Sequence, residues 1–141
     1  GEQMGWMSPK AYLNSPYRDL YRKAVRTRHA HSPFFYAGRL LRPPVVTTDR
    51  PDKTTTNIMA GNMVISTPMV MGALWQRLQD NARLLLLVNI DEATAKAEVT
   101  LDTADGEITL QGDVAGKGYV RGGKLTLELP PISWTAVELA R

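Results

Sequence analysis

The run Leu84-Leu85-Leu86-Leu87-Val88, closed by Asn89-Ile90-Asp91, is the most apolar stretch of the chain. Five consecutive apolar side chains between polar residues are typical of a β-strand that is buried on both faces. At about 1.5–3 kcal/mol for each buried side chain, this run contributes roughly 7–15 kcal/mol of gross stabilisation. The sequence therefore predicts that this strand lies at the centre of a sheet.

Alternating apolar and polar residues follow the central run almost to the end of the chain. The members expected on the inward face are Ala97, Val99 and Leu101, then Ile108 and Leu110, then Leu125, Leu127 and Leu129, then Thr135, Val137 and Leu139, all apolar except Thr135. Such alternation marks strands with one solvent-exposed face, and their regular spacing favours antiparallel pairing. We expect a mainly β chain in which residues 43–141 form an antiparallel β-sandwich of about seven or eight strands.

Residues 1–42 differ from this pattern and predict a helical N-terminal segment before the sandwich. Ser15-Pro16 joins a good N-cap residue to a proline that the first helical position tolerates. The helix is expected to stop near His31, because Pro33 disfavours helix at its predecessor. Its predicted apolar stripe consists of Tyr17, Leu20, Tyr21, Ala24 and Val25.

Arginines follow a second face of the same predicted helix. Arg18, Arg22 and Arg26 are spaced four residues apart, which places them on one side of the helix. This side lacks interleaved aromatic residues and the chain has no known nucleic-acid motif, so phosphate binding is the less favoured interpretation. A solvated face, or one paired with acids on a neighbouring domain, is the favoured interpretation.

Composition excludes several classes of protein. The 141 residues include no cysteine, which excludes a disulfide framework and a thiolate metal site. The net charge of +3 is well short of the excess that nucleic-acid-binding proteins usually carry. No run of about 18 apolar residues exists that would predict a membrane-spanning helix. We therefore expect neither nucleic acid nor membrane among the partners.

Residue types that carry chemistry elsewhere show no catalytic or metal-binding pattern. On a helix His29 and His31 point about 200° apart, so both cannot ligate one metal ion. The segment 112–118 is one residue short of a phosphate loop and lacks a Ser or Thr after its lysine, which favours a hairpin loop. Acids fall mostly in predicted turns, where calcium binding stays open. We predict no catalytic residue, no metal site and no cofactor.

Three stretches carry a resemblance to a known group of enzymes. Gly1-Glu2-Gln3-Met4-Gly5-Trp6 is similar to the loop after the last strand of a (β/α)-barrel. The segment 17–42, which ends Tyr36-Ala37-Gly38-Arg39-Leu40-Leu41, is similar to the final barrel helix and its exit. Segments 84–89 and 125–139 are similar to the closing strands of an antiparallel C-terminal domain. The chain thus resembles the C-terminal region of a TIM-barrel glycoside hydrolase-like protein.

The resemblance implies a division into residues 1–42, the end of the barrel, and residues 43–141, the sandwich. The catalytic acids of such enzymes lie on earlier barrel strands that this sequence does not contain, so no catalytic residue is carried over. The resemblance implies that Gln3 and Trp6 line the rim of the parent's active site. The expected role of this chain is non-catalytic, as a fragment that supports the catalytic barrel of its parent.

Two other functions stay open. A carbohydrate-binding module would bind a glycan with exposed aromatic rings, and Trp75 and Trp134 are candidate platforms. Trp6, Tyr12 and Tyr119 are further aromatic residues able to stack on a sugar. Packing in the core is the competing interpretation of these rings, because aromatic residues on strands are usually buried. A complete small hydrolase is the third function, and it would need an acid–base pair that the sequence does not display.

The expected partners follow from these functions. They are the catalytic barrel of the parent protein and, for the alternative function, a carbohydrate. Without the barrel, the apolar stripe of the helix and Phe34-Phe35 lose their usual cover, so the isolated fragment is expected to self-associate. The localisation stays open, with secretion or a periplasmic location as the options for the parent.

Overall fold

The structure, a computed structural model, describes residues 18–57 and 62–139 of the chain. The described residues form two helices, α2 (Arg18–Ala30) and α3 (Ser32–Phe35), and eleven strands. The strands are β1 (Gly38–Leu40), β2 (Val45–Thr48), β3 (Lys53–Asn57), β4 (Met63–Thr67), β5 (Val70–Arg77), β6 (Arg83–Asn89), β7 (Ala95–Thr100), β8 (Gly106–Gly112), β9 (Gly116–Arg121), β10 (Lys124–Leu129) and β11 (Ser133–Leu139).

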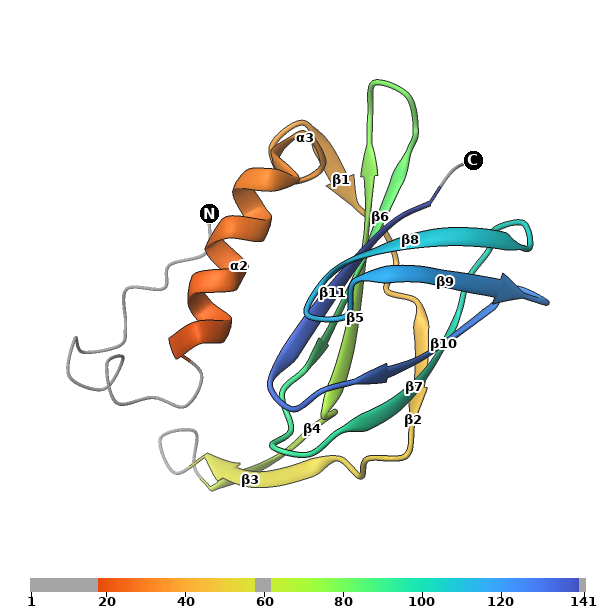
Figure 1. The fold of residues 1–141 in the computed structure, drawn as a ribbon. Coiled ribbons are helices and arrows are strands. Elements are labelled where there is room, and N and C mark those ends of the chain that lie inside the picture. Colours follow the sequence, from red (N-terminus) through yellow and green to blue (C-terminus); the bar gives the residue numbers. More distant parts are fainter. Residues whose placement is uncertain (1–17, 58–61, 140–141) are drawn as a thin grey trace.

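Nine of these strands form one antiparallel sheet in the order β1-β5-β6-β11-β8-β9-β10-β7-β2, and β3 and β4 form a separate hairpin. The sheet curls, so that β2 at one end lies against β5 near the other (Figure 1). A Cβ atom at Gly72 of β5 would lie 2.9 Å from Cγ2 of Val46, so the close approach needs glycine there. The predicted mainly β fold with sandwich-like antiparallel layers is confirmed, and both layers belong to one curled sheet.

The leucine run forms β6, as the sequence predicts. β6 lies between β5 and β11 and pairs with both along its length. Leu85 and Leu87 point into the interior of the curled sheet, whereas Leu84 faces the helices, and all three are 0% exposed. The prediction of a strand that is buried on both faces is confirmed.

The interior of the curled sheet holds the larger apolar core. Its buried members come from β5, β6, β7, β8, β9, β10 and β11 and from the turn after β7. They are Val70, Leu85, Leu87, Ala95, Ala97, Val99, Leu101, Leu110, Val120, Leu125, Leu127, Leu129, Val137 and Leu139. The inward residues of the predicted alternating strands all belong to this core or pack against it, apart from Thr135, which is buried and bonded to backbone carbonyls.

A second, smaller core lies on the outer face of β5, β6 and β11. Phe34 of α3 is 1% exposed and packs there with Leu84 and Ala136. Half-buried Trp75 and Trp134 also belong to this cluster. The expectation that β11 has one solvent-exposed face was therefore wrong near Ala136, because the helical segment covers that face (Figure 1).

Helix α2 ends at Ala30, as predicted, but it is turned differently from the prediction. Its buried residue is Thr27, and Lys23 on the same side donates to a carboxylate oxygen of Asp113. Val25, a member of the predicted apolar stripe, is 42% exposed. Lys23 and Asp113 join this face of α2 to the turn after β8, so the face toward the sheet is not the one that apolar periodicity alone would select.

The predicted hairpin loop at residues 112–118 is shorter in the structure, because β8 ends at Gly112 and β9 begins at Gly116. Gly112 and Gly116, with φ of +114° and +126°, flank the turn between β8 and β9. β9 then pairs with β8 and β10, and its Val120 lies in the core.

The strand β1, on the N-terminal side of the predicted boundary at residue 42, pairs with β5. The division of the chain at that boundary stays a prediction.

An ion pair closes the turn between β5 and β6, which falls at Asp80-Asn81. Arg77 donates from Nε and Nη2 to the two carboxylate oxygens of Asp80, at 2.9 and 2.7 Å. The same guanidinium lies 4.6 Å from the ring centroid of Phe34. These hydrogen bonds from Arg77, with one from the backbone of Ala82, lower the pKa of Asp80 from 3.8 to about 2.

This ion pair predicts how stability depends on acid pH. Because the folded pKa of Asp80 is depressed, its contribution is fully present above the unfolded pKa near 3.8 and is lost as the pH falls through about 2. Urea unfolding of the wild type and of Asp80→Asn at pH values from 6 down to 2 measures this. Below pH 4 the urea midpoint of the wild type should fall further than that of the variant. Parallel curves for wild type and Asp80→Asn would contradict the assignment.

Candidate functional site

The structure describes two of the four predicted carbohydrate contacts, Trp75 and Trp134. Gln3 and Trp6 lie outside the described residues. Trp75 of β5 and Trp134 of β11 both lie in the cluster beneath the helical segment. The ring of Phe35 meets Trp75 edge-on, with the centroids 5.0 Å apart. The two tryptophans therefore pack between sheet and helices, and sugar contact by either remains a prediction.

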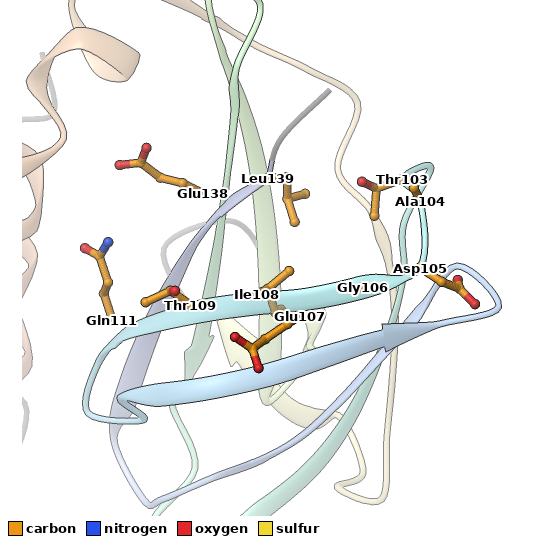
Figure 2. A pocket seen from close by; sticks show the side chains of 10 residues that line it. All are labelled: Thr103, Ala104, Asp105, Gly106, Glu107, Ile108, Thr109, Gln111, Glu138 and Leu139. Atoms are coloured by element: carbon orange, nitrogen blue, oxygen red, sulfur yellow. The ribbon is translucent and has the colours of Figure 1, made fainter.

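One concave surface of the described residues lies where β8 and β11 separate. Their ladder ends at the pair Val137–Leu110, and beyond it Glu138 and Leu139 diverge from β8. The resulting β8–β11 groove has a volume of about 570 Å³ and is open to solvent. Figure 2 shows its lining side chains on β8, on the turn before β8 and on the end of β11.

Polar side chains line most of the β8–β11 groove. Glu107, Thr109 and Gln111 project from one face of β8, and Glu138 projects from the neighbouring strand (Figure 2). Asp105 lies at the far end, in the turn before β8. This arrangement offers hydrogen-bond acceptors and donors to a polar ligand such as a polyol.

Each carboxylate of the groove already has a partner. Glu107 pairs with Nζ of Lys117 at 2.7 Å, and Glu138 lies 3.5 Å from Nδ1 of the buried His31. Asp105 accepts a hydrogen bond from the backbone of Gly123, and the backbone donors at residues 122 and 123 lower its pKa. A glycosidase needs a carboxyl group whose pKa is raised so that it can donate a proton. Asp105 has the opposite shift and stays ionised.

An exposed aromatic ring lies beside the groove. Tyr119 of β9 is 54% exposed and stands opposite Glu107 in the β8–β9 ladder. The guanidinium of Arg121 lies 5.2 Å from the centroid of the Tyr119 ring. Because cross-strand partners share a sheet face, Tyr119, Arg121 and Glu107 form one continuous surface with the β8–β11 groove.

Sequence reasoning gave this surface too little weight. The sequence marks Tyr119 only as one of several aromatic residues able to stack on sugar, and it follows directly after the predicted hairpin loop at residues 112–118. The available sequence signal is Tyr119-Val120, two residues of high strand preference. In the structure Tyr119 is exposed and Val120 is buried.

The two histidines lie in different surroundings. His29 is exposed on α2, whereas His31 is 5% exposed between the helices and Glu138. Within residues 18–57 and 62–139, no cluster of three or more His, Asp or Glu side chains is arranged to hold a metal ion. None of the helices in the same residues is long and apolar enough to cross a membrane.

Comparisons with known proteins leave the family open. No family model matches the chain, and neither a curated protein nor a solved structure gives a significant match. The resemblance to the C-terminal region of glycoside hydrolases therefore rests on the quoted sequence stretches alone and is carried forward as a proposal.

Proposed function

We propose that this chain is the non-catalytic C-terminal portion of a larger glycoside hydrolase-like protein, where it packs against and supports a catalytic barrel. The observation that carries the proposal is the attachment of the helical segment to the sheet. Phe34, at 1% exposed, is held between Leu84 and Ala136, and Lys23 bonds to Asp113 at the other end of the segment. A domain that joins its neighbour through a helix fixed in this way would hold the two in one orientation.

The chemistry of the β8–β11 groove also supports a non-catalytic role. Its three carboxylates are engaged with Lys117, His31 and backbone amides, which are contacts that hold strands and turns together. The three Asp carboxyls whose pKa values clearly depart from normal, at positions 80, 91 and 105, are all shifted downward. A downward shift suits a structural ion pair or turn and is unsuited to a general acid near neutral pH.

The test is to read the coding sequence upstream of Gly1 and to express the longer protein with and without this chain. We expect the upstream sequence to encode a barrel that hydrolyses aryl glycosides. Removal of this chain should make that barrel less soluble or lower its melting temperature. This chain alone should show no activity in the same assay. Turnover of aryl glycosides by the isolated chain would overturn the proposal, and so would an upstream barrel whose melting temperature is unchanged by the deletion. Self-association of the isolated chain stays an untested expectation.

A second candidate function is carbohydrate binding, and Tyr119 is the observation that favours it. The exposed ring, the cation beside it and the polar β8–β11 groove combine a stacking surface with hydrogen-bonding groups. Trp75 and Trp134, half-buried under the helices, are less accessible for stacking.

Alanine variants separate the two functions. If the chain binds glycans, Tyr119→Ala should abolish binding to soluble xylan, β-glucan or galactomannan in affinity electrophoresis, with stability changed by less than about 0.5–1 kcal/mol. Trp75→Ala should instead lower the free energy of unfolding by about 2–4 kcal/mol through lost packing. Lost glycan binding in Trp75→Ala at unchanged stability would move the binding surface to the tryptophans.

A further inference from the structure

The solvent face of α2 carries a regular stripe of basic residues. At about 100° of rotation per residue, positions spaced i, i+4, i+7, i+8 and i+11 fall on one side of a helix. Counted from Arg18, these positions are Arg22, Val25, Arg26 and His29, and all four are exposed. We call Arg18, Arg22, Val25, Arg26 and His29 the basic stripe of α2. It lies opposite Lys23 and Thr27, which face the sheet.

Within the described residues, the two central arginines of the stripe have no ion-pair partner. Among the cations of α2, Lys23 pairs with Asp113, Arg28 lies over the ring of Tyr36, and Arg18 approaches Asp19 at 3.7 Å. Arg22 and Arg26 form no ion pair with any residue in the described ranges 18–57 and 62–139.

This spacing is unfavourable for an isolated helix. Like charges at i and i+4 repel each other, so Arg22 has an unfavourable neighbour on either side, at positions 18 and 26. An acidic surface placed against the stripe would turn this repulsion into attraction. The helix therefore has an arrangement that a partner of opposite charge would stabilise.

We propose that the basic stripe of α2 docks onto an acidic protein surface, that of the catalytic domain preceding this chain. The inference rests on the proposed function for the identity of that partner. Arginine suits a protein interface, because its planar guanidinium binds carboxylates with two hydrogen bonds and is weakly hydrated. Val25, 42% exposed between the arginines, adds a small apolar contact at the centre.

The composition of the stripe disfavours two other anionic partners. Insertion at a membrane surface uses large apolar side chains opposite or among the cations, and the stripe offers only Val25. Binding of single-stranded nucleic acid uses aromatic rings on which bases stack, and the stripe contains no Phe, Tyr or Trp. A carboxylate-bearing protein surface needs neither.

The experiment uses the full chain and a labelled helical peptide that carries glutamates at i, i+4 and i+8. Fluorescence anisotropy is measured at low salt and at about 0.5 M salt, with a glutamine version of the peptide as control. We expect the wild type to bind the glutamate peptide and to lose this binding in high salt. The double variant Arg22→Gln/Arg26→Gln should bind about three- to tenfold more weakly.

A matched variant separates a local site from net charge. Lys96→Gln/Lys124→Gln removes the same charge from β7 and β10 and should change peptide binding less than about twofold. Equal weakening in both double variants would overturn the inference, as would no weakening in either. Tighter binding of a DNA duplex or of phosphatidylserine vesicles through the same two arginines would also overturn it, by assigning the stripe to nucleic acid or membrane.

The two experiments distinguish a failure of the docking proposal from a failure of the proposed function. If the peptide fails to bind while an upstream barrel still melts earlier without this chain, the docking stripe alone is wrong. If the peptide binds through Arg22 and Arg26 while the isolated chain hydrolyses aryl glycosides, the proposed function is wrong, and with it the identity of the partner, whereas docking of the stripe onto an acidic protein surface stands.

Discussion

Replacing Asn89 with alanine is expected to lower the free energy of unfolding by about 3–5 kcal/mol. The side chain is 0% exposed at the end of β6. Its Nδ2 donates to the carbonyls of Ala93, Leu129 and Pro130 at 2.9, 3.1 and 2.9 Å, and its Oδ1 accepts the backbone N–H of Asp91 at 2.9 Å. Alanine would remove this partner from the carbonyls of Ala93 and Leu129 and from the N–H of Asp91. The carbonyl of Pro130 would keep its hydrogen bond from Oγ of Ser133. The groups that lose a partner lie in two segments, the loop after β6 and the end of β10.

Urea unfolding followed by tryptophan fluorescence measures this loss. Gln111→Ala is the matched control, because it removes an amide from an exposed position on β8, and it should change stability by less than about 0.5 kcal/mol. Asn89→Asp should also destabilise the protein at neutral pH, because a carboxylate cannot donate to three carbonyls. A loss below about 1 kcal/mol in Asn89→Ala would show that water replaces these hydrogen bonds and that the side chain does not fasten the strand ends.

Much of the sheet could be predicted because its signals are local. The period-two alternation of Leu125, Leu127 and Leu129 needs only neighbouring residues to be recognised, and so does the unbroken run that forms β6. The turn at Asp80-Asn81 is similarly local, since Asn81 adopts a positive φ of 60° that asparagine tolerates. In each case the short-range preference and the tertiary structure agree.

The orientation of α2 could not be predicted, because it depends on a residue far away in the sequence. Apolar periodicity selected a stripe that includes Val25, but the contact of Lys23 with Asp113, ninety positions later, brings another face to the sheet. Strand β9 was missed for a related reason. Its glycines and lysine carry little strand preference, and it forms by pairing on both sides with β8 and β10.

The candidate site was predictable only in part. The sequence draws attention to Trp75 and Trp134 as aromatic residues on strands, but it could not reveal that both join the cluster that includes Phe34 and that Phe35 of α3 packs on Trp75. The β8–β11 groove has no sequence signal, because it arises where two paired strands diverge after Val137. A site made by the ending of a ladder depends on the curvature of the whole sheet, which no local pattern reports.

Phe34→Ala is the second change with a large expected effect, a loss of about 3–5 kcal/mol. The ring is 1% exposed, fills the space between Leu84 and Ala136, and lies under the guanidinium of Arg77. Because α3 is a single short turn, it has little stability of its own, and its attachment depends on this packing. The variant should therefore release the helical segment from the outer face of the sheet.

Two measurements follow that release. Urea unfolding gives the loss in stability, and limited trypsin digestion should cut the variant faster after Arg22 and Arg26, which lie in the part of α2 that Phe34 helps to hold. Tyr36→Ala is the control, since its ring is 63% exposed, and it should leave both measurements nearly unchanged. If Phe34→Ala costs less than about 1 kcal/mol and does not speed cleavage, the helical segment is only loosely attached to the sheet. The proposed role in fixing a neighbouring domain would then lose its physical basis, because a rigid connection requires the helix and the sheet to move as one body.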